Sequence, residues 1–149
     1  MHEIIEARMT DKIRSELRDA RRNPDPAAAA AAEELIMAPA YVRAPVEALD
    51  FALETVDPRG AEETWRDMIR LQDSGAYPAA FASIRIPVLM LHGDFDPHPG
   101  DLIRESLRRH IPHLEYRPLA ECGHYPWLER TAAEPFYRAI GDWLAKTPP

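Results

Sequence analysis

The sequence predicts an α/β protein, with a helical segment at residues 1–83 followed by alternating strands and helices at residues 84–149. Three observations lead to this prediction. Apolar residues recur at helical spacing before residue 83, a continuous apolar run begins at residue 87, and a second strand-like stretch follows one helix later. Two strands separated by a helix are typical of a parallel pair, so we expect a β-α-β-α arm after the helices.

Composition favours a globular protein in the cytoplasm. The 149 residues are 46% apolar and 29% charged, with a formal net charge of -7. Basic residues do not cluster, which disfavours a nucleic-acid surface. The single cysteine, Cys122, can form no intrachain disulfide, and no apolar stretch is long enough for a signal peptide or a membrane span. We therefore expect no nucleic-acid or membrane partner.

The segment before residue 83 is predicted to contain four helices. Apolar residues four positions apart predict the first, and a run of alanines predicts the second. Proline and serine-glycine pairs bound the fourth. The predicted helices cover residues 5–22, residues 27–37, residues 45–53, and the stretch from Asp57-Pro58 to Ser74-Gly75.

The arm after residue 83 is predicted to contain two strands and two helices. Residues 87–91 form a continuous apolar run, typical of a strand buried on both faces of a parallel sheet. A helix with apolar residues from Leu102 to Leu107 follows, and residues 114–119 form the second strand. Thr131 and Glu134 have capping-box spacing, which predicts that the last helix opens there.

Asp96 and His124 are the candidate catalytic residues. Asp96 follows the first predicted strand after a glycine turn, and His124 follows the second, in the loop AECGHYPWLE. Active sites of open parallel sheets lie at such carboxyl ends. A carboxylate can hold an imidazole in one tautomer while the other ring nitrogen accepts a proton from a nucleophile.

The stretch from Ile84 to Lys146 resembles the C-terminal arm of the α/β-hydrolase fold. The likeness consists of a strand, H-G-D-x-D, a helix, a strand, G-H-x-P-x-x-E and a closing helix, in that order. It implies that Asp96 is the acid and His124 the base of a catalytic triad, and that the helices before residue 83 form a lid. It further implies a small-molecule substrate cleaved at an ester, amide or related bond, without a cofactor or metal.

The nucleophile of that family is missing from this sequence. It is usually a serine in G-x-S-x-G, placed before the acid. Before residue 93 the only glycines are Gly60 and Gly75, and neither Ser74 nor Ser83 has glycines at the required spacing. We therefore expect half of a fold: a truncated or decayed copy, or one piece that pairs with a complementary N-terminal half or with itself through exposed strand edges.

Two other functions remain open. The alternating His92, Asp94, Asp96 and His98 can hold a divalent metal. A strand followed by D-x-D also resembles phosphohydrolases of the haloacid dehalogenase type, although Pro97-His98 stands where a Gly or Thr is expected and no later lysine with an acidic metal-binding pair follows. The other alternative is a non-catalytic interaction module that retains idle hydrolase features.

Several further residues receive structural interpretations. Asp94 is interpreted as a turn residue and Glu129 as an anchor for its loop or for the last helix. Cys122 is disfavoured as a nucleophile because it follows the acid and shares the loop of the base. The following are interpreted as surface or packing residues: His92, His98, His110 and His113, with His98 at the mouth of the site, and Trp65, Met68 and Tyr77, for which a pocket wall is the alternative.

Overall fold

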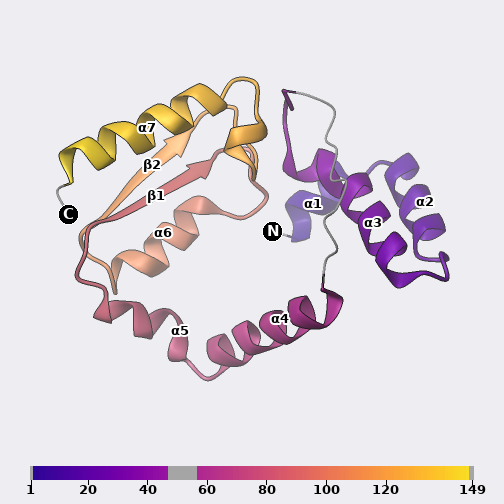
Figure 1. The fold of residues 1–149 in the computed structure, drawn as a ribbon, viewed down its shortest axis with the longest axis horizontal. Coiled ribbons are helices and arrows are strands. Elements are labelled where there is room, and N and C mark those ends of the chain that lie inside the picture. Colours follow the sequence, from indigo (N-terminus) through magenta and orange to yellow (C-terminus); the bar gives the residue numbers. More distant parts are fainter. Residues whose placement is uncertain (1, 47–56, 148–149) are drawn as a thin grey trace.

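The protein has a mixed α/β fold, seen in a computed structural model that describes residues 2–46 and 57–147 (Figure 1). Among these residues, no helix is both long enough and apolar enough to cross a membrane. The helices are α1 (His2–Arg8), α2 (Asp11–Ala20), α3 (Pro26–Tyr41), α4 (Pro58–Asp73), the single turn α5 (Ala76–Ala79), α6 (Gly100–Arg108) and α7 (Ala133–Lys146), with short 3-10 turns at Ala80–Ser83 and Pro126–Leu128.

The strands β1 (Val88–Gly93) and β2 (Leu114–Leu119) pair in parallel, as predicted, with Val88 opposite Leu114. Helix α6 connects them, and α6 and α7 lie on opposite sides of the pair (Figure 1). The prediction of a strand buried on both faces is wrong, because residues 88–92 are only half-buried. The described part of the sheet contains two strands, so each has one unpaired edge.

The predicted helices before residue 83 are confirmed in part. The first is divided into α1 and α2, because Thr10 is extended and its Oγ1 accepts a hydrogen bond from the Ile13 N–H at 3.2 Å, capping α2. Helix α3 includes the predicted 27–37 and continues to Tyr41. Helix α4 is confirmed, with Asp57 as its N-cap and Gly75 at φ 73 just beyond its end.

The predicted helix at residues 45–53 is not present at residues 45 and 46, the part of it that the structure describes. Pro45 lies in an isolated antiparallel bridge with Glu129, so its backbone is extended, and residues 47–53 lie outside the described residues. Residues 41–46, which we call the bridging segment, run beside residues 123–130. The Val46 N–H donates to the Leu128 carbonyl and the Arg130 N–H to the Ala44 carbonyl, both at 2.8 Å.

The start of α7 differs from the prediction. The Thr131 hydroxyl donates to the carbonyl oxygen of Glu121 at 3.1 Å, and the Glu134 carboxylate pairs with Arg138, so neither side chain takes part in a capping box. Helix α7 begins at Ala133. Its Phe136 packs against a small buried cluster of Leu119, Cys122 and Ala132 at the end of the sheet where Asp96 and His124 lie.

Candidate active site at the ends of the two strands

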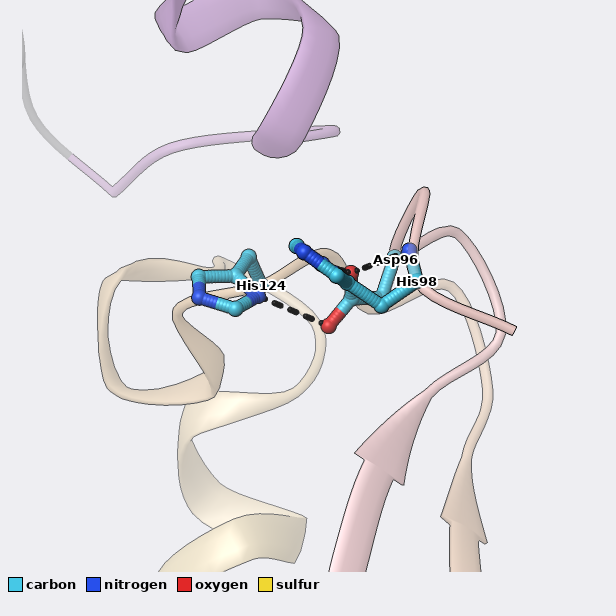
Figure 2. A group of neighbouring side chains, drawn as sticks. All are labelled: Asp96, His98 and His124. Carbon is cyan, nitrogen blue, oxygen red and sulfur yellow. Dashed lines mark hydrogen bonds and ion pairs between the residues drawn. The ribbon is translucent and has the colours of Figure 1, made fainter. Parts of the chain in front are cut away.

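Asp96 and His124 meet, as predicted, beyond the carboxyl ends of β1 and β2 (Figure 2). The Oδ2 atom of Asp96 lies 2.8 Å from Nδ1 of His124. The Asp96 side chain is only 7% exposed, whereas that of His124 is 39% exposed. The acid is therefore shielded, while the imidazole remains accessible to another reactant.

The orientation of the His124 ring follows from its contacts. In neutral imidazole one nitrogen carries the proton, and an ionised carboxylate beside Nδ1 favours the proton there. The other nitrogen, Nε2, is then free to accept a proton. The rings of Tyr41 and Tyr125 lie edge-on to His124, with centroids 5.8 and 4.9 Å away, and limit its rotation.

Hydrogen bonds keep Asp96 ionised. Burial alone would raise the pKa of its carboxyl group. The backbone N–H of His98 and the side chains of His124 and His98 together outweigh this effect and hold the pKa below its ordinary value of 3.8. Asp96 is therefore a carboxylate at neutral pH, as an orienting acid must be.

His98 is a third member of the site. Its backbone N–H donates to Oδ1 of Asp96 at 2.9 Å and its Nδ1 lies 2.8 Å from the same oxygen. The structure therefore places His98 beside Asp96, in agreement with the expectation that it lies at the mouth of the site. The signal in the sequence was D-x-H, since aspartate commonly accepts a hydrogen bond from the backbone two residues later.

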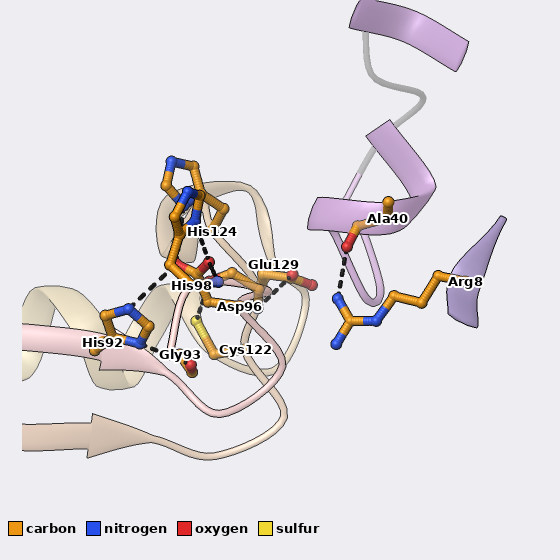
Figure 3. Close-up of polar contacts among 10 residues, drawn as sticks. Arg8, Ala40, His92, Gly93, Asp96, His98, Cys122, His124 and Glu129 are labelled. Atoms are coloured by element: carbon orange, nitrogen blue, oxygen red, sulfur yellow. Dashed lines mark hydrogen bonds and ion pairs between the residues drawn. The ribbon is translucent and has the colours of Figure 1, made fainter. Parts of the chain in front are cut away.

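His92 also faces Asp96 (Figure 3). Its Nδ1 lies 2.9 Å from the Gly93 carbonyl oxygen, to which it can only donate, and its Nε2 lies 3.5 Å from Oδ2 of Asp96. The His92 side chain is 11% exposed. Three histidines therefore surround one carboxylate, where the sequence predicted one.

Asp94 and Cys122 form a separate contact. Oδ1 of Asp94 accepts a hydrogen bond from the backbone N–H of Cys122 at 3.2 Å, which confirms the interpretation of Asp94 as a turn residue and separates it from the alternating metal motif. Cys122 is fully buried, and burial, followed by the nearby Glu129, Asp94 and Asp96 carboxylates, raises the pKa of its thiol to about 12. A thiol of this kind is a poor nucleophile.

Glu129 anchors the loop that carries His124, as predicted. Its fully buried carboxylate accepts three backbone hydrogen bonds: from Arg43 at 2.8 Å, from Ala44 at 2.7 Å and from Gly123 at 2.8 Å. Two of these donors belong to the bridging segment and one to the residue before His124. Glu129 thus binds residues that lie 86 and 85 positions before it, through contacts that the sequence does not reveal.

Helix α1 also reaches the site. The Arg8 guanidinium lies 3.6 Å from the centroid of the Phe95 ring, the residue before Asp96. It also donates to the Ala40 carbonyl at 2.6 Å (Figure 3). The cation-π contact joins α1 to the turn after β1, and the hydrogen bond joins α1 to the end of α3. No pattern in the sequence predicts this contact.

A cavity of about 400 Å³ opens beside the site. Asp96, His98 and His124 form part of its wall, and Met90, Trp127 and Phe136 give it an apolar side. A larger cavity of about 540 Å³, lined by Met68 and Tyr77 among others, contains neither Asp96 nor His124. Trp65 is 64% exposed and lines neither cavity, so it is not a packing residue among the described part of the chain.

Ser74 and Ser83 are not placed as nucleophiles. The Ser74 hydroxyl donates to the Leu71 carbonyl and the Ser83 hydroxyl to the Ala80 carbonyl, each within its own helix end. Comparison with known proteins adds no candidate, because no family model, curated protein or solved structure matches this chain.

Proposed function

We propose that Asp96 and His124 are the acid and base of an α/β-hydrolase-type enzyme whose nucleophile lies outside these 149 residues. The observation that supports this proposal most strongly is the 2.8 Å contact between Oδ2 of Asp96 and Nδ1 of His124. It joins a shielded carboxylate to an accessible imidazole across two adjacent parallel strands. The same relationship is required of the last two members of a hydrolytic triad.

The proposed reaction proceeds through a covalent intermediate. Nε2 of His124 takes the proton from a nucleophile hydroxyl as its oxygen bonds to the substrate carbonyl carbon. The imidazolium then gives that proton to the leaving group as the bond to it breaks. Water, deprotonated by the same nitrogen, releases the acyl group and restores the hydroxyl. Asp96 holds the Nδ1–H tautomer and stabilises the imidazolium throughout.

The neighbouring cavity favours a small substrate with an apolar group. Its volume of about 400 Å³ is within the range of small-molecule sites. The side chains of Met90, Trp127 and Phe136 can bury an acyl or alkyl chain, and His124 lies at the same wall. These features are compatible with ester, amide and related bonds, because the bond cleaved depends on the nucleophile and its oxyanion donors.

The polypeptide that supplies the nucleophile is proposed to dock beside β1. Strand β1 has an unpaired edge among the described residues, and its side chains from Val88 to His92 are only half-buried. A complementary half carrying G-x-S-x-G would extend the parallel sheet there and cover those faces. No cofactor is required.

Co-expression with a complementary half tests this proposal. The DNA upstream of the gene is translated in all frames, and any segment that encodes strands and G-x-S-x-G is produced with this chain. We expect turnover of p-nitrophenyl esters only when both polypeptides are present. His124→Ala should abolish turnover, and Asp96→Asn should lower kcat by roughly four orders of magnitude.

His110→Ala is the matched control, because it removes a histidine that takes no part in the site. It should leave turnover of the complex unchanged. Ester turnover that survives His124→Ala would contradict the proposal. So would an upstream region that encodes no such segment, combined with no turnover by the chain alone.

A further inference from the structure

We propose that Asp96, His98 and His124 together form a binding site for a divalent transition metal, with Zn²⁺ as the best match. One ligand atom from each of these residues lies within 4.8 Å of the other two (Figure 2). The inference does not depend on the hydrolase proposal, because it concerns which ion the group binds.

The donor set suits zinc. Two imidazole nitrogens and one carboxylate oxygen are common ligands of Zn²⁺, whereas Mg²⁺ and Ca²⁺ prefer oxygen. Three protein ligands leave a fourth tetrahedral position open to water. The motif proposed from the sequence differs from this set: Asp94 is turned to the backbone of Cys122, and His124 from the other loop takes its place.

The present spacing requires the ligand atoms to draw together. Ligand atoms on a tetrahedral zinc at about 2.0 to 2.1 Å are separated from one another by roughly 3.3 Å. One ligand atom from each residue now lies within 4.8 Å of the other two, so the rings must approach by at most about 1.5 Å. The side chains of His98 and His124 are 35% and 39% exposed, so their rings can move without displacing the core.

The hydrogen bonding of Asp96 also suits a metal ligand. Its Oδ1 accepts a hydrogen bond from the His98 backbone N–H at 2.9 Å, and its side chain is only 7% exposed. Hydrogen bonding that orients a ligand carboxylate is typical of metal sites.

Metal binding would exclude the acid-base role of the same residues. A metal on Nδ1 of His124 takes the place of the proton that this nitrogen would otherwise donate to Asp96. The metal-bound chain could therefore not perform the triad reaction, and Zn²⁺ would act as its inhibitor. His98 separates the two functions, because it is a ligand in this site but has no role in the proposed triad.

Calorimetric titration of the intact chain with ZnCl₂ tests the site. We expect one ion per chain, no heat with MgCl₂, and visible absorption bands when Co²⁺ replaces Zn²⁺. His98→Ala and His124→Ala should each weaken Zn²⁺ binding by at least roughly 100-fold, since even residues that only support metal ligands contribute 10- to 100-fold. His110→Ala should bind Zn²⁺ like the unchanged protein. Circular dichroism confirms that each variant is folded.

The metal site and the hydrolase proposal fail separately. Absence of stoichiometric Zn²⁺ binding, or unchanged affinity in both His98→Ala and His124→Ala, would overturn the metal site and leave the triad proposal intact. Conversely, Zn²⁺ binding that His98→Ala removes would support the metal site even if no complementary hydrolase half is found.

Discussion

The backbone N–H of His124 donates to the carbonyl oxygen of Tyr41 at 2.8 Å, so the end of α3 holds the candidate base. The contact lies beside the buried Glu129 carboxylate, which binds both the bridging segment and Gly123. The loop that carries His124 is therefore positioned by residues from the helical segment as well as by β2. The position of this loop depends on a few buried polar contacts.

Replacing Glu129 should destabilise the protein strongly. Glu129→Ala leaves three backbone N–H groups without their charged acceptor, and each such hydrogen bond contributes about 1.5 to 3 kcal/mol. We expect the free energy of unfolding to fall by at least about 3 kcal/mol, measured by urea denaturation followed by tryptophan fluorescence. The free energy of unfolding of Glu129→Gln should lie between those of the unchanged protein and Glu129→Ala, because the amide oxygen of glutamine retains part of the acceptor capacity.

Glu134→Gln is the control for that measurement. Glu134 is 81% exposed and pairs only with Arg138 on the surface of α7. Its replacement should change the free energy of unfolding by less than about 0.5 kcal/mol. Equal effects of the buried and the exposed replacement would show that Glu129 does not anchor the loop.

Two glycine-to-alanine replacements should have opposite effects. A Cβ at Gly123 would overlap the Tyr41 carbonyl and the Glu129 carboxylate, whereas a Cβ at Gly141 meets no atom within 4 Å. Gly123→Ala should lower the thermal midpoint, because the backbone of the His124 loop must move. Gly141→Ala, within α7, should stabilise the protein by up to about 1 kcal/mol through its better helix propensity. An unchanged thermal midpoint in Gly123→Ala would contradict the close approach of Gly123 to Tyr41 and Glu129.

The lowered pKa of Asp96 should make stability depend on pH in acid. A carboxyl group whose folded-state pKa lies below its unfolded value of about 3.8 stabilises the fold above that value. This contribution is lost as pH falls through the folded-state pKa. Asp96→Asn lacks it, so the stability difference between the two proteins should be larger at about pH 5 than at about pH 3, measured by urea denaturation. A difference independent of pH over this interval would refute the assignment.

Cys122 should be unreactive in the folded protein. Raising its thiol pKa from 9.0 to about 12 lowers the thiolate fraction at pH 8 by roughly a thousandfold, and its burial hinders access of a reagent. We expect a disulfide reagent such as DTNB to label it only in urea. Rapid labelling of the native protein, or loss of ester turnover by the assembled enzyme in Cys122→Ala, would reopen its role as a nucleophile.

Local sequence patterns were sufficient to predict the strand pair and the meeting of Asp96 with His124. Residues 114–119 were predicted with the bounds that β2 has, and the order of turn and loop placed both side chains at one sheet edge. The misses have two physical causes. One is local hydrogen bonding: the Thr10 hydroxyl caps α2 at a break that apolar periodicity does not reveal, and the Thr131 hydroxyl donates to the Glu121 carbonyl and not to a capping box.

The other cause is contact between distant residues. The pairing of the bridging segment with residues 123–130 and the three backbone bonds of Glu129 have no local signal. The convergence of His92 and His98 on Asp96 depends on how one turn folds back on itself. Strand β1 is half-buried because of which other elements cover the sheet, and this cannot be predicted from the residues of the strand alone.

The hydrogen bond between Tyr41 and His124 also has a thermodynamic consequence. A ligand of α1 to α3 that displaced Tyr41 would break this hydrogen bond and so act on the His124 loop. In that case a ligand at the Asp96 and His124 site would change the affinity of the first ligand by the same factor.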